Sequence, residues 1–270
     1  MSRTQIYRRA AQAGLFARAV VYTLLAVLAL DAVFGVGGSG NPDPTTAFRT
    51  LEKAPAGQMA LAVLGAGLIT YALWRLIQAF MDAEDEGRDA VGLISRLGML
   101  TSGISHFLLG VSAFAILATA GAGDSPGGGD TQAAARFLLQ QPLGRFALAL
   151  AGLALAGSGA AQIWRAWTLQ YEEAMRAATT VRRFRPVTRF GVGGRGLIFI
   201  LIGGFIVLAA LEADASEAKG LAGTLGWLRQ QPYGEAFYIL AGLALLGYAV
   251  YSVVEALYRR ITPPDSVTKS

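Results

Sequence analysis

The chain has 270 residues, of which 54% are hydrophobic and only 15% are charged. Soluble domains carry roughly 25% charged residues, so this composition indicates a protein that uses lipid as its solvent. Cysteine is absent and histidine occurs once, which excludes a disulfide framework, a thiolate metal site, an iron–sulfur cluster and a bis-histidine haem within one chain. The basic residues behind the net charge of +5 flank apolar segments instead of covering one soluble face, so we expect no nucleic-acid partner.

Six apolar segments are long enough to cross a hydrocarbon core about 30 Å thick, which takes about 20 helical residues. In chain order, the predicted spans cover residues 12–34, 57–81, 97–119, 143–167, 190–211 and 234–258. The basic start of the chain and the apolar run after it are also typical of a signal peptide. We reject that interpretation because the first span has two internal counterparts, as the repeats below indicate.

The first, third and fifth spans begin with one shared pattern. A glycine is followed one turn later by Arg or Ser, then by a small residue, and one turn further by a ring. The aligned columns hold Gly14, Gly98 and Gly191; Arg18, Ser102 and Arg195; Ala19, Gly103 and Gly196; and Tyr22, His106 and Phe199. Small residues at helical spacing are typical of close helix packing in membranes.

A second signature introduces the even spans, where a proline precedes a glycine by two residues. The pairs are Pro55 and Gly57, Pro142 and Gly144, and Pro232 and Gly234. We expect each proline in the first helical turn, where its missing N–H is harmless. Both signatures recur at a period of roughly ninety residues, which predicts three two-helix repeats. We assign these repeats to residues 12–81, 95–167 and 188–260, followed by a flexible tail at 261–270.

The predicted fold class is therefore an all-α polytopic membrane protein. Each repeat contributes two spans, so all three enter the membrane in the same orientation, which predicts parallel repeats around a pseudo-three-fold axis. Between the spans of each repeat lies a short amphipathic segment, at residues 44–54, 131–141 and 221–231. We expect these segments to be helices on the outer membrane surface, although helices in solvated loops would give the same pattern.

Charge predicts the orientation of the chain. Six of the 23 Lys and Arg residues lie in or beside the odd-to-even loops, namely Arg49, Lys53, Arg136, Arg145, Lys219 and Arg229. The others lie towards the opposite end of the spans, many of them in the segment 168–189, which we expect to be an interfacial loop that binds anionic lipid heads. The positive-inside rule then places both termini in the cytoplasm.

Ionisable side chains inside spans cost about 2.5–3.5 kcal/mol at the membrane centre, so they are candidate functional residues. The candidates are Arg18, Arg75, Arg165, Arg195 and Glu255. One interpretation is that they anchor the helix ends and pair between helices. The other is that Arg18 and Arg195 meet Glu255 or a phosphate head group in one ligand-binding site, which Ser102 makes asymmetric.

His106 shares its column with Tyr22, so we expect a polar ring in an aromatic packing position instead of a metal ligand or a proton relay. Tyr22 and His106 complete the set of candidate ligand-binding residues. No catalytic triad, nucleotide loop or zinc motif can be assembled from the sequence, so we predict no catalytic residues, no metal, no cofactor and no enzyme activity.

The repeated Gly-x-x-x-(Arg/Ser)-(Gly/Ala) helix starts and the Gln-Gln-Pro-x-Gly turns resemble a bacterial membrane family known as domain of unknown function 1206, over residues 13–260. The resemblance implies a six-span protein of the bacterial cytoplasmic membrane and carries no activity with it. Two functions stay open. One is a non-enzymatic structural, lipid-binding or accessory subunit, with membrane lipids and a membrane protein as partners. The other is a transporter or channel for small solutes or ions with a cytoplasm-facing polar cavity.

Overall fold

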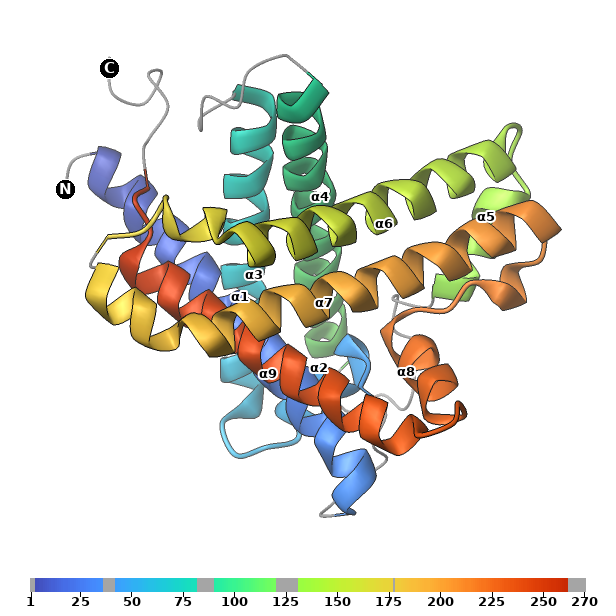
Figure 1. Cartoon of the computed structure of the whole chain (residues 1–270). Helices are drawn as coiled ribbons and strands as arrows, with labels where there is room; N and C mark the ends of the chain where they lie inside the picture. Colours follow the sequence, from blue (N-terminus) through green and yellow to red (C-terminus); the bar gives the residue numbers. More distant parts are fainter. Residues whose placement is uncertain (1–2, 36–41, 82–89, 120–130, 177, 262–270) are drawn as a thin grey trace.

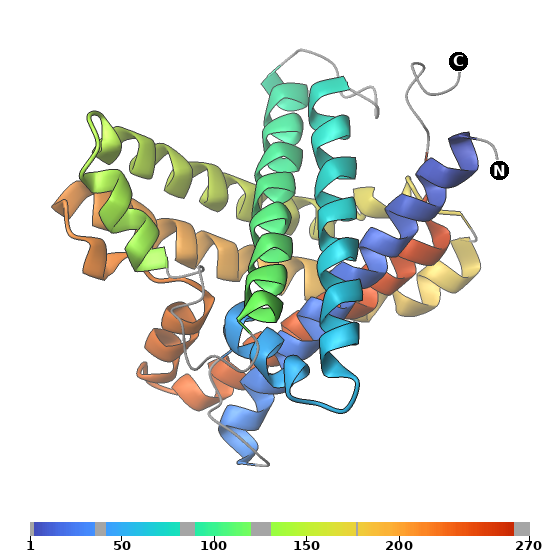
Figure 2. The same cartoon turned by 180° about the vertical axis from the view of Figure 1, so that it is seen from behind.

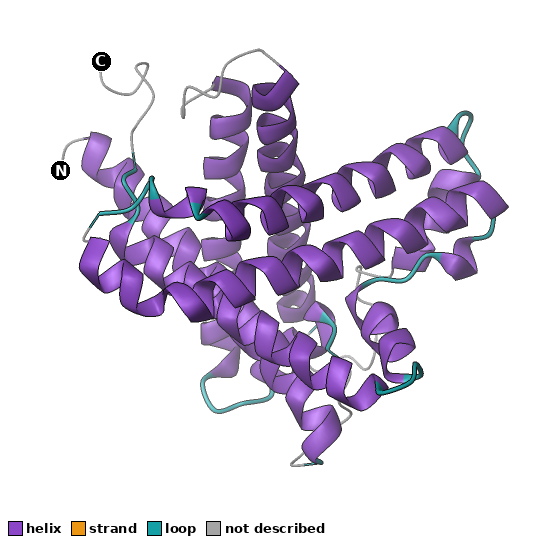
Figure 3. Cartoon of the chain, viewed as in Figure 1, coloured by secondary structure: helices purple, strands orange, loops and turns teal. Residues whose placement is uncertain are grey.

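The computed structural model describes residues 3–35, 42–81, 90–119, 131–176 and 178–261, and they are almost entirely helical (Figure 3). Six helices are long and apolar enough to cross a membrane, which confirms the predicted six-span all-α fold. They are α1 (Arg3–Phe34), α3 (Gly57–Met81), α4 (Ala90–Ala118), α6 (Gly144–Thr168), α7 (Ala178–Glu212) and α9 (Gly234–Tyr258). Apart from Ile261, the predicted tail lies outside the described residues.

The fifth span differs from its prediction, because α7 begins twelve residues earlier than the expected start and runs through Pro186. A proline inside a helix removes one backbone hydrogen bond. Side chains support the helix around it: the Thr188 hydroxyl donates to the Arg185 carbonyl at 3.2 Å and lies 3.0 Å from the Tyr171 hydroxyl. The expected loop is irregular only between α6 and residue 176, where the short helix η1 (Gln170–Glu172) lies.

The prediction that each repeat proline lies in the first helical turn is wrong. Each lies in a turn just before its helix and is followed by a residue with left-handed backbone, namely Ala56, Leu143 or Tyr233. The N–H of Gly57 donates to the Ala54 carbonyl at 2.8 Å, as in a type II turn with proline at its second position. The next residue must be glycine, since a Cβ there would collide with a carbonyl of the preceding short helix.

The even helix of each repeat packs along the odd helix of the next repeat: α3 against α4, α6 against α7, and α9 back against α1. These three pairs run in clearly different directions (Figures 1 and 2). Glycines allow the close approach, since a Cβ on Gly196 of α7 would lie 2.6 Å from the Gly159 carbonyl oxygen of α6. The cyclic order is compatible with the pseudo-three-fold axis, which stays a prediction.

The second repeat is more open than the others, because α4 and α6 contact each other far less than α1 contacts α3 or α7 contacts α9. The helix α6 is correspondingly the least buried of the six spans. Its exposed face carries large apolar side chains such as Leu150 and Leu153. This face of α6 is therefore not covered by other described helices of the bundle.

Short helices occupy the three amphipathic segments: α2 (Pro44–Glu52), α5 (Thr131–Leu139) and α8 (Leu221–Arg229), with the short turn η2 (Ala215–Glu217) before α8. Phe48 of α2 and Leu225 of α8 are fully buried in the main apolar core, together with Leu25 and Leu61 of the spans. By contrast, α5 packs in a separate cluster at the ends of α6 and α7. Two of the three short helices therefore cap the core of the bundle.

Candidate functional site

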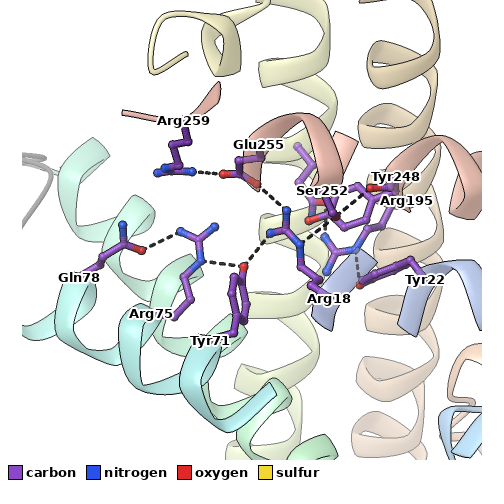
Figure 4. A network of polar contacts seen from close by, with 11 residues as sticks. Arg18, Tyr22, Tyr71, Arg75, Gln78, Arg195, Tyr248, Ser252, Glu255 and Arg259 are labelled. Atoms are coloured by element: carbon purple, nitrogen blue, oxygen red, sulfur yellow. Dashed lines mark hydrogen bonds and ion pairs between the residues drawn. The ribbon is translucent and has the colours of Figure 1, made fainter. Parts of the chain in front are cut away.

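Arg18 of α1 lies in the middle of the bundle with 1% of its surface exposed. Its Nε donates to the Ser252 hydroxyl at 3.0 Å, and its two terminal nitrogens donate to the Tyr71 hydroxyl at 2.7 Å and to Glu255 Oε2 at 2.5 Å (Figure 4). All three nitrogens of the guanidinium thus have acceptors, which come from α3 and α9. This residue ties the first repeat to the third.

Glu255 of α9 is the carboxylate partner of this cluster and is as deeply buried as Arg18. It also accepts a hydrogen bond from Arg259, the residue that follows the last residue of α9. Arg75 of α3 donates to the same Tyr71 hydroxyl at 2.8 Å, and both Arg75 and Arg259 lie over the ring of Trp74. Charged hydrogen bonds and ring faces together offset the cost of burying these charges.

Arg195 of α7 forms a second buried centre, with 7% of its surface exposed. Its Nε donates to the Tyr22 hydroxyl at 2.5 Å and one terminal nitrogen donates to Gln162 Oε1. The guanidinium also lies 3.9 Å from the ring centroid of Phe199 and 4.4 Å from that of Tyr248. Among the described residues, its hydrogen bonds and ring contacts are all with neutral groups.

His106 of α4 is buried with its ring centroid 4.6 Å from that of Tyr71. Its Nδ1 lies 2.8 Å from the Ser102 carbonyl oxygen, one turn earlier in the same helix. His106 therefore lies in an aromatic packing position, as expected from its alignment with Tyr22. Within the described residues, no group of three or more His, Cys, Asp or Glu side chains could hold a metal ion.

Six of the seven sequence candidates are thus gathered in the centre, and Arg165 is the exception. Arg165 lies on the exposed side of α6 and donates to the Ser95 hydroxyl of α4 at 3.2 Å. The sequence analysis missed Trp74, Gln78 and Arg259 as members of the cluster. An alignment of the even spans from their prolines carries part of that signal, because it puts Gln78 in one column with Arg165 and Glu255.

The side chains of the centre are buried, and a hollow of about 400 Å³ in the protein surface lies away from them. That hollow is at the turn between α2 and α3, and its lining residues are Glu52, Ala54, Ala56, Gly57, Gln58 and Met59. Arg18, Glu255 and His106 are each at most 4% exposed. The arrangement can therefore hold helices together and fix buried positive charge in a part of the described structure that is shielded from the solvent.

The family model described as Domain of Unknown Function (DUF1206) matches three segments of the chain, residues 13–82, 97–169 and 190–259. The chain is also 29% identical to the uncharacterized protein YxxB of Bacillus subtilis (strain 168) over 259 residues, which covers 94% of this chain and 92% of that protein. No solved structure matches. The three matched segments correspond to the three two-helix repeats.

Proposed function

The chain belongs to the family described as Domain of Unknown Function (DUF1206), and since that description carries no activity, we propose a function from the buried centre. We propose that the protein is a non-enzymatic structural or accessory component of the bacterial cytoplasmic membrane. In this role, the buried polar cluster holds the three repeats in one arrangement, and the lipid-facing surface offers binding sites for lipids or for another membrane protein.

The observation that carries this proposal is the closed Arg18–Glu255 pair. Both side chains are 1% exposed, and each nitrogen of Arg18 already has an acceptor within the bundle. A solute pathway needs polar groups that face water, whereas these face one another. Phe48 and Leu225 add apolar caps from α2 and α8. Such a centre favours a packing role over a route through the membrane.

The proposal predicts that reconstituted protein does not conduct. Proteoliposomes loaded with radiolabelled phosphate, and others tested for chloride and glycerol permeation by light scattering, are expected to leak no faster than protein-free vesicles. The reason is that Arg18, Arg195 and Glu255, charged groups in the centre of the bundle, are each at most 7% exposed. A saturable flux that is lost in the Arg195→Gln variant would instead establish a transporter.

Anion transport is the second candidate, and Arg195 is the observation that favours it. A buried guanidinium whose described contacts are all neutral is typical of a site that accepts a negatively charged ligand. The flux measurement above separates the two functions. Phosphate flux in wild-type vesicles supports transport, and its absence supports the accessory role.

We further propose that both termini are cytoplasmic and that the exposed Arg182 and Arg183 of α7 bind anionic head groups, at about 1 kcal/mol per residue. The natural sequence has no cysteine, so single cysteines report orientation directly. In intact cells, we expect an impermeant maleimide to label Ser216→Cys but not Glu173→Cys, both at exposed positions. Labelling of Glu173→Cys without permeabilisation would contradict the proposed orientation and would place this side of the protein outside the cell.

A further inference from the structure

In the first and the third repeat, the two helices of the repeat meet at the glycine that begins the odd-span pattern. In the first, a Cβ on Gly14 of α1 would lie 2.7 Å from the Tyr71 Cα of α3. In the third, a Cβ on Gly191 of α7 would collide with the Gly247 carbonyl carbon of α9. Only a glycine allows the backbones to come this close. These two repeats are therefore closed by a backbone contact at equivalent positions.

The second repeat keeps the glycines of this contact but holds them apart. Gly98 of α4 is the repeat equivalent of Gly191. Gly157 of α6 is equivalent to Gly247, since each lies at the same distance past the proline of its repeat. A Cβ on Gly98 or on Gly157 would meet no described atom of a neighbouring helix within 4 Å. The two halves of a glycine contact thus lie on either side of an open seam between α4 and α6.

One end of this seam is already held together. The Arg165 side chain near the end of α6 donates to the Ser95 hydroxyl near the start of α4 at 3.2 Å. Elsewhere α4 and α6 contact each other little. The short helix α5, which connects the other ends of the two spans, packs at the ends of α6 and α7 and does not join the main core as α2 and α8 do. The seam therefore widens from the Arg165 end towards α5.

One turn after the repeat glycine, the second repeat differs from the other two. In each closed repeat, one helix has a glycine at this level and the other has an alanine, so a single methyl group fills the contact. A Cβ on Gly67 of α3, for example, would lie 2.6 Å from the Ala17 Cβ of α1. The second repeat has a threonine and an alanine there, so two side chains compete for the same space. The three pairs are Ala17 with Gly67, Thr101 with Ala154, and Gly194 with Ala244.

We propose that the second repeat has a second, closed conformation in which Gly98 contacts Gly157, and that Thr101 is the wedge that favours the open one. The two glycines permit the close approach. The Thr101 side chain opposes it, as overpacking does. Two packings of one helix pair then form a bistable element.

Closure changes how much of α4 and α6 is available to lipids or to a partner protein. It would also let α5 approach the core, as α2 and α8 do in their repeats. The inference stands whether or not the accessory function holds, because it concerns the movement of two helices of this chain and requires no partner.

Distances between spin labels on α4 and α6 test this proposal. The natural sequence has no cysteine, so Ala115→Cys with Ala147→Cys, both at exposed positions, places one label on each helix. Leu208→Cys with Phe237→Cys labels the equivalent positions of the closed third repeat and gives the reference distance. In double electron–electron resonance of the full-length protein in lipid nanodiscs, we expect a dominant long distance and a minor short distance that matches the reference.

Three variants make the test specific. Thr101→Gly recreates the pair of the third repeat and is expected to raise the ratio of the short to the long distance about tenfold. Gly157→Leu fills the place of the contact and is expected to remove the short distance. Ile104→Gly is the matched control, because it adds a glycine to the same helix at a position that is exposed in all three repeats, as Val20 and Leu197 are. This control is expected to leave the ratio unchanged.

A single long distance in both the wild-type protein and Thr101→Gly would overturn the proposal, as would a short distance that persists in Gly157→Leu. The labelled protein is also diluted with unlabelled protein. A short distance that disappears on dilution joins two chains, so it would assign the seam to a contact between copies and refute closure within one chain.

Discussion

The hydroxyl of Tyr71 is shared by two guanidinium groups, those of Arg18 at 2.7 Å and Arg75 at 2.8 Å. One oxygen thus accepts from two buried or half-buried cations on neighbouring helices. Its ring also contacts the rings of Trp74 and His106. Tyr71 therefore joins the polar and the aromatic parts of the centre, and its hydroxyl and its ring can be tested separately.

Tyr71→Phe keeps the ring contacts and removes the shared acceptor, so two arginine N–H groups lose their partner. We expect a loss of about 1–3 kcal/mol of unfolding free energy, which is the usual cost of leaving buried polar groups unsatisfied. Unfolding in mixed micelles, followed by circular dichroism, measures this change. Tyr251→Phe is the matched control, because no described hydrogen bond involves the Tyr251 hydroxyl. Equal losses of unfolding free energy in the two variants would show that the hydroxyl of Tyr71 makes no specific contribution to stability.

Glu255→Gln leaves Arg18 and Arg259 without their carboxylate in a buried environment. The expected loss is about 3–5 kcal/mol, since breaking a buried ion pair leaves an uncompensated charge. The same unfolding assay measures it, with the exposed Glu173→Gln as control. The double variant Arg18→Met with Glu255→Met is expected to recover part of the loss, because the deeply buried guanidinium of Arg18 is removed together with its carboxylate, whereas Arg259 keeps its contact with the Trp74 ring. A double variant as unstable as Glu255→Gln would argue against this account.

At the level of single residues, the sequence identified the charged side chains within the spans, but it did not predict how they are arranged in the bundle. Charges in apolar segments are rare, so Arg18, Arg195 and Glu255 could be recognised directly. Whether a long side chain points into the bundle or away from it depends on how the helix is rotated and packed. For that reason Arg165, which occupies the same repeat position as Glu255, was grouped with the site although it lies on the exposed side of α6.

At the level of helices, the contact between α6 and α7 depends on glycine. A Cβ on Gly196 would lie 2.6 Å from the Gly159 carbonyl oxygen, and a Cβ on Gly152 would lie 2.8 Å from the Gly203 carbonyl oxygen. These separations are too short for real Cβ contacts, so a methyl group forces the helices apart. Gly157 of α6 has open space around it and provides the contrast.

Gly196→Ala is therefore expected to destabilise the protein by about 1–3 kcal/mol, as overpacking does. Gly157→Ala, which adds the same methyl group to the open side of α6, is expected to be neutral or to stabilise by up to about 1 kcal/mol, because alanine favours the helix. Urea unfolding of the detergent-solubilised variants compares the two. Similar stabilities would mean that α6 and α7 can separate without cost.

Helices were the most predictable part of the molecule, because a long apolar run is a local property of the sequence. Their ends were less predictable. Ala56, Leu143 and Tyr233 give no sign of left-handed backbone, so the turns after the short helices were misplaced by a few residues. The continuation of α7 through Pro186 depends on contacts with η1, which lies well before it in the chain.

At the level of the whole molecule, the repeats are not independent units, since the strongest packing is between the even helix of one repeat and the odd helix of the next. Sequence periodicity revealed the number of repeats, but it carries no information on which faces meet. The cyclic order α3 with α4, α6 with α7 and α9 with α1 emerges only in three dimensions (Figure 1).

The pairing of α1 with α9 also sets a constraint on biosynthesis. The first helix leaves the ribosome with Arg18 in its apolar stretch, whereas Ser252 and Glu255 are made near the end of translation. Until then, α1 lacks two of its acceptors, and the ring of helices cannot close. A chain that stops before α9 would leave the Arg18 guanidinium with the Tyr71 hydroxyl but without its carboxylate, a chemical mark of incomplete synthesis that quality-control proteases can recognise.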